Sequence, residues 1–370
     1  MKTKIFVILV LLVMFLTGCS NQEIQPTNNN SNSNAITNSS SSDEQSIKNY
    51  EKNIEPQITL NNVLGSKDNP FIITNIDDLV NAFTKTTKNN YYKLSNDITY
   101  TSHYSMESFD SFDGFFDGDN HKLINFMVNG GLFKKVSGTI ENLVIEKSSA
   151  SAYNKGADIK CGMLANELLT GATINNSKII DCNVHASAST YKESEGVDIN
   201  AYIGGLVGYM HNKSNIYNCD VKNLDGCCHL EYHDKGWQVD PISEAPHSYF
   251  GGLVGAVGGK CIIRNNFVQD VKCLADNTVR VSCLFGPDIY SIMSLAGFIG
   301  YVSNLDSIIQ DNQIFIDKDK FIANLYYRND AFLNLIGNKK NWCLITENIG
   351  NIYGTLKSGV DSATGRKFYV

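Results

Sequence analysis

Short apolar stretches separated by glycine and asparagine recur along most of this chain. A Gly-Gly-Leu-Val-Gly-like stretch returns five times, and each time an Ile-x-Asn-Cys-like stretch follows it. The five pairs are Gly130–Phe133 with Ile140–Leu143, Gly162–Leu164 with Ile179–Cys182, Gly204–Gly208 with Ile216–Cys219, Gly251–Gly255 with Ile263–Asn266, and Ala296–Gly300 with Ile309–Asn312. A weaker sixth pair is Leu335–Gly337 with Ile345–Asn348. Successive pairs follow at roughly 30 to 50 residues, a spacing typical of stacked repeats.

Each repeat is predicted to consist of short strands and turns. The apolar runs are short and rich in β-branched residues, and no helical period is long enough to fill the gaps between them. A unit of this kind cannot cover its own apolar face, whereas stacking one unit on the next covers it. The pattern therefore predicts a parallel β-solenoid. The last position of the second stretch, which holds Cys182 and Cys219, is predicted to form an internal ladder of adjacent side chains.

A short amphipathic helix is predicted ahead of the repeats. Asn75 can cap its first turn, and Leu79, Val80 and Phe83 then share one face. We expect this helix to close the open end of the stack, where unpaired strand edges would otherwise favour aggregation.

The paired stretches resemble the GLUG motif, a glycine-rich repeat of bacterial surface proteins, and the segment 112–124 is similar to the one that commonly precedes such repeats. The resemblance implies a right-handed parallel β-helix of the pectate-lyase-like type. Residues 56–129 would form the capping helix and the first coils, 130–350 the GLUG-like repeats and 351–370 a C-terminal tail. The motif is structural and implies no activity of its own.

The first residues resemble a bacterial lipoprotein signal. Lys2 and Lys4 precede the apolar run Ile5–Leu16, and Leu-Thr-Gly-Cys ends it at Cys19. The run is too short to remain as a membrane-spanning helix. We expect residues 1–18 to be removed and Cys19 to be lipidated and to hold the protein at the bacterial cell envelope. The polar tract 19–55 has little to bury and is predicted to be a disordered tether.

Charge argues against one class of partner. The net charge is −7, and arginine occurs only four times, at Arg264, Arg280, Arg328 and Arg366. No basic block is present, so nucleic acid is not expected as a partner. Nothing in the sequence calls for a cofactor.

Ten cysteines are unusual for a chain of this kind. With Cys19 assigned to lipid, nine remain and cannot all pair within one chain. Cys182 and Cys219, placed on one ladder, could form a disulfide or lie stacked as buried thiols, and parallel side chains favour the thiols.

Two clusters have the residue types of metal or acid–base sites. Cys227, Cys228 and His229, with His233 and Asp234 behind them, suit zinc chemically, although adjacent cysteines are a poor zinc spacing. The second cluster comprises Asp110, Asp113, Asp117, Asp119 and His121. Because Asp-Gly pairs favour tight turns, this cluster is interpreted as turn structure. We expect neither a metal site nor a catalytic residue.

Four inserts of unequal length fall at the same point of the repeat and are predicted to align along one side of the stack. They are Lys147–Lys160, His185–Tyr202, Lys222–Tyr249 and Gln269–Ser294. Their aromatic residues are Tyr153, Tyr191, Tyr232, Trp237 and Tyr290. Aromatic side chains on exposed loops suit stacking on a glycan or contact with a protein, and packing onto the coil wall is the alternative. The insert that carries Trp237 is the predicted centre of recognition.

Two function classes remain. The first is a lipid-anchored surface protein that acts as an adhesin, a ligand-binding protein or an envelope scaffold, with a glycan or a host or envelope protein as partner. The second is a carbohydrate-active β-helix enzyme, either a polysaccharide lyase or a hydrolase. β-Helix hydrolases usually carry Asn-Thr-Asp, Asp-Asp, Gly-His-Gly and Arg-Ile-Lys signatures. Only one Asp-Asp occurs, at Asp77-Asp78 in the predicted helix. The sequence therefore favours a protein that is not an enzyme.

Overall fold

The computed structural model describes residues 63–85, 87–192, 199–234, 246–281, 289–303, 306–329, 339–346, 349–352, 358–361 and 366–369. These residues belong to one compact unit, Ile58–Val370. They are almost entirely strands, with one α-helix, α1 (Ile76–Phe83), and one 3₁₀ turn, η2 (Lys318–Lys320), among them. No helix in these ranges is long and apolar enough to cross a membrane. The predicted signal peptide, Cys19 and the tether lie outside the described residues.

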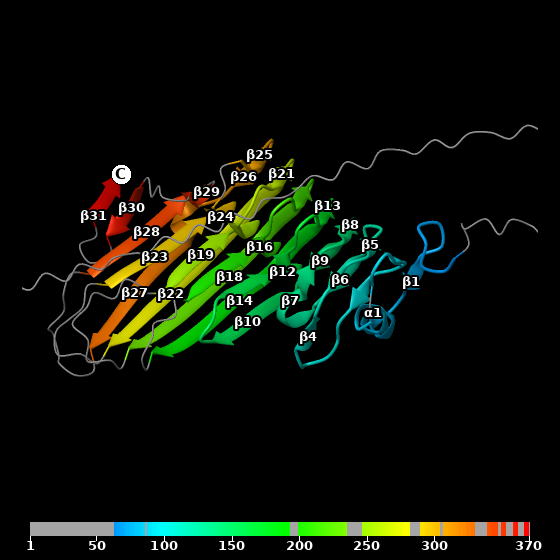
Figure 1. The fold of residues 1–370 in the computed structure, drawn as a ribbon, viewed down its shortest axis with the longest axis horizontal. Coiled ribbons are helices and arrows are strands. Elements are labelled where there is room, and N and C mark those ends of the chain that lie inside the picture. The colour runs from blue at the N-terminus through cyan, green and yellow to red at the C-terminus, as the bar shows by residue number, and fades with distance from the viewer. Residues whose placement is uncertain are drawn as a thin grey trace, which may run out of the picture. The chain divides into compact units, whose positions relative to one another are not determined.

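The strands form three sheets, here called I, II and III (Figure 1). Sheet I contains, in spatial order, β1 (Phe71–Ile73), β2 (Tyr91–Leu94), β5 (Phe115–Asp117), β8 (Thr139–Glu141), β13 (Thr173–Asn175), β17 (Asn215–Tyr217), β21 (Ile262–Arg264) and β25 (Ile308–Gln310). Sheet III contains β11 (Ile159–Gly162), β15 (Asn200–Gly204), β19 (His247–Gly251), β23 (Ile289–Ala296), β28 (Lys339–Thr346), β30 (Ser358–Asp361) and β31 (Arg366–Tyr369).

Sheet II has two arms that meet at β7 (Met127–Val136). The first arm is β12 (Ala165–Leu168), β16 (Val207–Met210), β20 (Val254–Val257), β24 (Ile299–Val302) and β29 (Ile349–Ile352). The second arm is β10 (Ser149–Lys155), β14 (Lys178–Lys192), β18 (Asp220–Asp234), β22 (Phe267–Val281), β26 (Gln313–Phe315) and β27 (Phe321–Asn329). The sheet also takes in β3 (Ile98–Thr99), β4 (Met106–Phe109), β6 (Lys122–Ile124) and β9 (Val144–Glu146).

The chain visits these sheets in a fixed order. β11, β12, β13 and β14 lie in sheets III, II, I and II, and β15 to β18 follow the same order and pair with them in parallel. β19 to β22 then pair with β15 to β18 in the same way. The predicted all-β repeat architecture is therefore confirmed, and the stacked parallel strands are consistent with a parallel β-helix (Figure 1).

Strand pairing corrects the predicted register of two repeats. β13 places Ile174 opposite Ile140 and Ile216, so the second repeat uses Ile174–Ser177 where Ile179–Cys182 was predicted. In the sixth repeat, Thr346 lies opposite Ala296 of the glycine stretch, so Ile345 does not begin an Ile-x-Asn-Cys stretch. Leu335–Gly337 lies outside the described residues.

Cys182 and Cys219 do not share a ladder as predicted, because the second repeat has a different register. Cys182 lies opposite Leu224, and Cys219 belongs to the next turn along the chain. Both are nevertheless buried free thiols, as predicted. Burial raises the pKa of Cys182 to about 11 and that of Cys219 to about 12. Both thiols are therefore protonated at neutral pH.

The asparagines of the repeat occupy a turn with left-handed backbone. φ is positive at Asn142, Asn176, Asn218, Asn265 and Asp311, which occupy equivalent positions in successive repeats. Asn and Asp adopt this conformation at lower cost than other residues with a side chain, which explains the residue choice.

The glycines lie where strands of neighbouring coils come into close contact. A Cβ atom on Gly255 would collide with the backbone nitrogen of Ile203 and the carbonyl oxygen of Gly208. Only glycine permits this approach of sheet III to the first arm of sheet II.

The predicted amphipathic helix is present as α1. Asn75 accepts a hydrogen bond of 2.9 Å from the backbone N–H of Asp78. Leu79 and Phe83 are buried, whereas Val80 is 36% exposed and does not share the core face as predicted. The Phe83 ring lies 5.0–5.4 Å from five other aromatic rings, those of Tyr92, Phe109, Phe112, Phe116 and Phe133. This cluster fills the core at the first coils.

Candidate ligand-binding sites

In their described parts, the four predicted inserts are mostly strands and not surface loops. β14, β18 and β22 run side by side in continuous register, from Lys178 opposite Asp220 to Lys192 opposite Asp234 and onward to Val281. Inserts at the same point of the repeat do align, as predicted, but they align as the second arm of sheet II. Alternate side chains in this arm therefore point into the core.

The predicted aromatic residues differ in their exposure. Tyr153 on β10 is 68% exposed, whereas Tyr232 on β18 is fully buried, so its predicted role in a recognition surface is wrong. Tyr191 lies in β14 and Tyr290 in β23, at positions whose side chains are not described. Trp237 lies outside the described residues.

A groove of about 740 Å³ lies at the fork of sheet II, beside Tyr153. β7 creates the fork, because Met127–Asn129 pair with β10 whereas Phe133–Val136 pair with β12. Gly130, with φ +98°, lies between these two segments and provides the bend. We call this cavity the fork groove. Its other lining residues include Glu107, Asn129, Lys134, Lys135, Ser151, Asp158, Lys160, Asn166 and Glu167.

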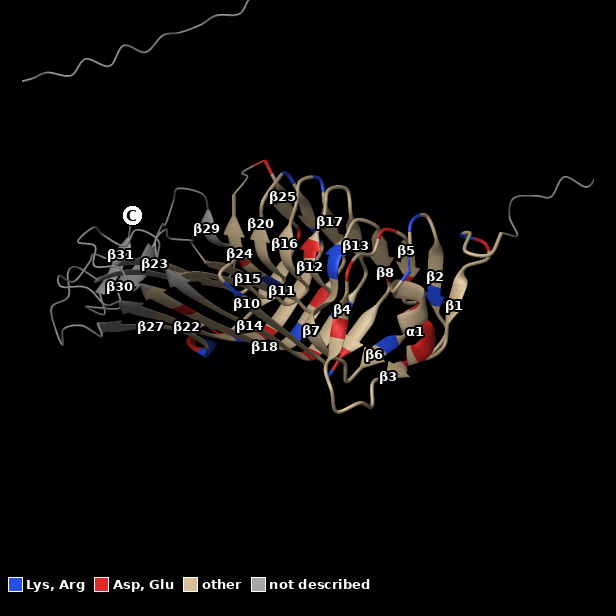
Figure 2. Cartoon of the chain, turned by 60° about the horizontal axis from the view of Figure 1, so that its bottom comes forward, with Lys and Arg blue, Asp and Glu red and all other residues tan. Residues whose placement is uncertain are grey.

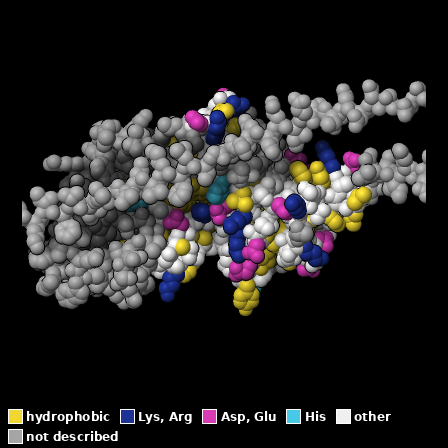
Figure 3. Space-filling model, in the orientation of Figure 1, with side chains coloured by type: hydrophobic (Ala, Val, Ile, Leu, Met, Phe, Trp, Pro, Cys, Tyr) yellow, Lys and Arg dark blue, Asp and Glu magenta, His cyan; other side chains and the backbone are white. Residues whose placement is uncertain are grey.

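Polar side chains of the fork groove are held by one another. Glu167 accepts hydrogen bonds from Lys160 at 2.9 Å and pairs with His211 at 2.8 Å. Burial would raise the pKa of Glu167, but these two bonds outweigh it, and the pKa lies below its ordinary value. Asp158 accepts from the Asn200 backbone at 2.9 Å. On the face seen in Figure 3, basic and acidic side chains lie next to one another around β4 and β7.

Tyrosines continue from the fork groove along the boundary between sheet III and the first arm. The Tyr202 and Tyr249 rings stack at 5.3 Å, Tyr209 meets Tyr202 edge-on at 5.3 Å, and Tyr301 lies 4.9 Å from Tyr249. The Lys160 ammonium lies 4.8 Å from the Tyr209 ring centre. Burial raises the pKa of Tyr202 and of Tyr209. An aromatic wall thus adjoins the charged groove.

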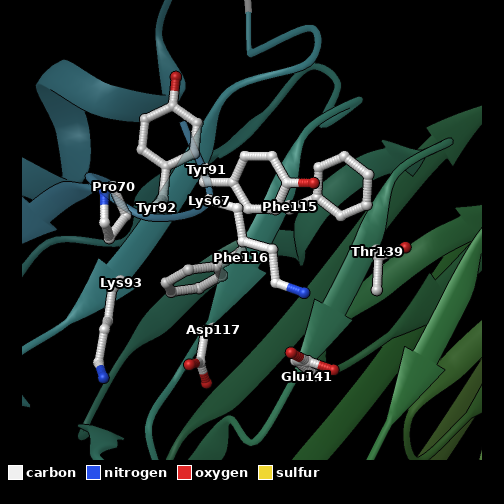
Figure 4. A pocket seen from close by; sticks show the side chains of 10 residues that line it. All are labelled: Lys67, Pro70, Tyr91, Tyr92, Lys93, Phe115, Phe116, Asp117, Thr139 and Glu141. Carbon is white, nitrogen blue, oxygen red and sulfur yellow. The ribbon is translucent and has the colours of Figure 1, made fainter. Parts of the chain in front are cut away.

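A second cavity, of about 500 Å³, lies on sheet I near the first coils (Figure 4). We call it the aromatic pocket. It is lined by Lys67, Pro70, Tyr91, Tyr92, Lys93, Phe115, Phe116, Asp117, Thr139 and Glu141. The Tyr91 and Phe115 rings are parallel within 7°, with centres 4.3 Å apart. Charged residues of both signs lie on β2 and β5 in this region (Figure 2).

Sequence reasoning missed the aromatic pocket, although a signal was present. Phe115 and Phe116 are adjacent in one strand, and successive strand residues point to opposite faces. One phenylalanine must therefore face outward. Phe116 is 1% exposed and Phe115 is 39% exposed.

The two clusters with metal-like composition do not form metal sites in the described part of the chain. Cys227 and Cys228 are neighbours in β18, and only Cys228 is fully buried. The aspartates of the first coils serve separate structural contacts. Asp113 accepts from Thr87, Asp117 accepts from the backbone of Asp119, and Asp110 pairs with Lys134. The turn interpretation of that segment is confirmed by the left-handed backbone at Asp119, with φ 48°.

No protein-family model matches the chain, and no curated protein matches it. The solved structures that it resembles include these two. One is the crystal structure of a proposed immunoglobulin A1 protease from Bacteroides ovatus, with 18% identity and a TM-score of 0.39 over 70% of this chain and 85% of that one. The other is SRRP of L. reuteri 53608, with 12% identity and a TM-score of 0.17 over 70% of this chain and 100% of that one. At such scores neither likeness bears on function.

Proposed function

We propose that this protein is a lipid-anchored protein of the bacterial cell surface whose body, a right-handed β-helix with closed coils, binds a glycan or a protein ligand. An adhesin, a receptor or an envelope scaffold would all fit this description. The observation that carries the binding role is the fork groove, where exposed Tyr153 borders a cavity with charged residues of both signs. The lipoprotein-like sequence at Cys19 supports the anchor.

The enzyme alternative, a polysaccharide lyase or hydrolase, has less support. A glycoside hydrolase needs a carboxylic acid whose pKa is raised. In the described part of the chain, the carboxyl groups with a resolved shift are Asp78, Asp110, Glu146 and Glu167, and all are shifted downward. Hydrogen bonds from neighbouring groups lower these pKa values, for Glu167 against the opposing effect of burial. None of these four groups therefore has the raised pKa that the general acid of a glycoside hydrolase needs.

Cells that display the full chain provide the test. They would be screened for attachment to immobilised glycans and extracellular matrix proteins, and Tyr153→Ala should reduce attachment to whichever surface binds. Tyr104→Ala is the matched control, because Tyr104 is 82% exposed and does not line the fork groove. Equal attachment by both variants would exclude the fork groove as the binding site. Release of reducing ends or of unsaturated products from any glycan would support the enzyme instead.

A further inference from the structure

We propose that the aromatic pocket on sheet I is a binding site for a neutral saccharide. This site extends the ligand-binding role proposed above and does not depend on the fork groove. Its volume of about 500 Å³ lies within the range of small-molecule sites, ~300–1,000 Å³. Four observations carry the assignment: a fixed aromatic ring, a polar rim, charges of both signs and the absence of free strand edges among the strands that form the pocket.

The Phe115 ring is held in place and partly uncovered. Tyr91 covers one of its faces, with 4.3 Å between ring centres and 7° between planes. The neighbour on its other side is Thr139, directly opposite on β8 and much smaller than a ring. Both residues line the cavity, and Figure 4 shows how they lie. The apolar C–H face of a pyranose can pack against such a ring, because the ring is already positioned and loses little entropy.

Hydrogen-bonding groups lie at one end of this space. Asp117 and Glu141 are opposite one another on β5 and β8, one position along each strand from Phe116 and Ile140 (Figure 4). Asp117 Oδ1 accepts from Asn142 Nδ2 at 2.8 Å and from the Asp119 backbone at 2.8 Å. These bonds fix the carboxylate and leave its second oxygen for a ligand. A sugar hydroxyl pairs well with a carboxylate that is already oriented.

Charges of both signs line the pocket. Two lysines, Lys67 and Lys93, face two carboxylates, Asp117 and Glu141. Lys93 is itself paired with Asp119 at 3.0 Å, and this hydrogen bond raises its pKa. A strongly acidic or basic polymer would meet like charges here, whereas a neutral ligand with many hydroxyls would not.

A peptide that adds a strand does not suit this site. β2, β5 and β8 each have a paired strand on both sides, so their backbone N–H and C=O groups are already used. Strand addition requires a free sheet edge. The pocket therefore offers side chains only, which suits a ring-shaped ligand with polar edges.

Titration of the full chain in detergent with neutral tetrasaccharides tests the proposal. Cellotetraose, maltotetraose, mannotetraose and chitotetraose would be screened by saturation-transfer NMR, and the best ligand would be measured by calorimetry. Phe115→Ala should weaken binding roughly tenfold, equivalent to ~1.4 kcal/mol. Phe115→Trp keeps a stacking surface and should preserve binding. Glu141→Gln should weaken binding less, because an amide still accepts and donates hydrogen bonds.

Two controls separate the outcomes. Tyr104→Ala removes an exposed aromatic residue elsewhere and should leave binding unchanged. Far-UV circular dichroism of Phe115→Ala must match that of the parent. If Phe115→Ala does not fold, binding is judged from Phe115→Trp, which keeps a stacking surface, and from Glu141→Gln. Lack of binding by all four sugars, or unchanged affinity in Phe115→Ala, would overturn the site. If only Tyr153→Ala loses binding, the fork groove is the saccharide site and the proposal for the aromatic pocket is overturned.

Discussion

At the scale of single residues, a buried amide links successive coils. Asn266 is 1% exposed and accepts a hydrogen bond of 2.9 Å from the Cys219 backbone, while its amide donates to Asn312 Oδ1 at 2.9 Å. A buried polar group of this kind contributes most when all its partners are present, and removing it leaves those partners unsatisfied.

Asn266→Leu should therefore lower the free energy of unfolding by about 2 kcal/mol, since the Cys219 N–H loses its acceptor. Urea denaturation followed by circular dichroism measures this change. Gln269→Leu is the control, because the side chain of Gln269 makes only a local hydrogen bond with Asp270. If both variants unfold at the same urea concentration, the hydrogen bonds of Asn266 to the neighbouring coils do not stabilise the stack.

A partly buried histidine should make stability depend on pH. Burial lowers the pKa of His247 to about 4 from an ordinary value of 6.5, and its Nδ1 lies 3.0 Å from the Ile292 backbone nitrogen, which donates to it. The unfolded chain thus binds more protons between these two values. The stability due to neutral His247 is complete above the unfolded pKa and is lost as pH falls toward the folded pKa.

Between neutral pH and pH ~5, His247 alone should lower the free energy of unfolding by about 2 kcal/mol. His247→Asn keeps an acceptor but cannot be protonated, so its unfolding free energy should fall less steeply over the same range. His185, whose pKa is also lowered by burial, remains in the variant and leaves a residual slope. Identical pH profiles for parent and variant would show that His247 is not linked to folding.

At the scale of elements, sequence reasoning succeeded where a residue type is fixed by local geometry. The Asn75 cap follows from local backbone geometry, and the structure confirms it. The left-handed asparagines and the close-contact glycines obey the same kind of local rule, although the sequence analysis did not predict them. Register is a different matter, because it depends on which strands pair. Ile174–Ser177 and Ile179–Cys182 both fit the Ile-x-Asn-Cys pattern loosely, and only pairing with β8 and β17 distinguishes them.

The long strands of the second arm were harder to predict for another reason. Cys182, Val184, Ala186 and Ala188 alternate inward along β14, and a period of two is the strand signal. Alanine has low strand propensity, however, and the intervening residues are polar, so the segment resembles a polar insert. Burial of Tyr232 follows from the same alternation in β18. The prediction for Tyr232 was wrong because its insert was taken for a loop, whereas Tyr153 is exposed, as expected.

A glycine at a close contact between strands gives a test at this scale. Gly255→Ala should destabilise the protein by about 2 kcal/mol or more, because the new methyl group meets the backbone of Ile203 and Gly208, which cannot rotate away. Gly156→Asn is the control. Gly156 has φ +77° and open space where a Cβ atom would lie, and asparagine tolerates that conformation. Thermal unfolding should place the melting temperature of Gly255→Ala below that of Gly156→Asn, and the reverse order would contradict the close-contact argument.

At the scale of the whole molecule, binding by the body matters for the cell only if the chain is held at the surface. The proposed anchor rests on the apolar run Ile5–Leu16 and the Leu-Thr-Gly-Cys sequence at Cys19. One acyl chain binds a membrane only marginally, so stable attachment requires two or three.

Cys19→Ala should therefore abolish labelling by a palmitate analogue and leave the protein uncleaved or released, because the thiol that accepts the lipid is missing. Fractionation and gel shift of labelled cells measure both effects. Cys182→Ala is the matched control, since this buried thiol has a pKa of about 11 and cannot serve as a lipid acceptor in the folded protein. Labelling that survives in Cys19→Ala would refute the anchor while leaving the predictions for the folded body intact.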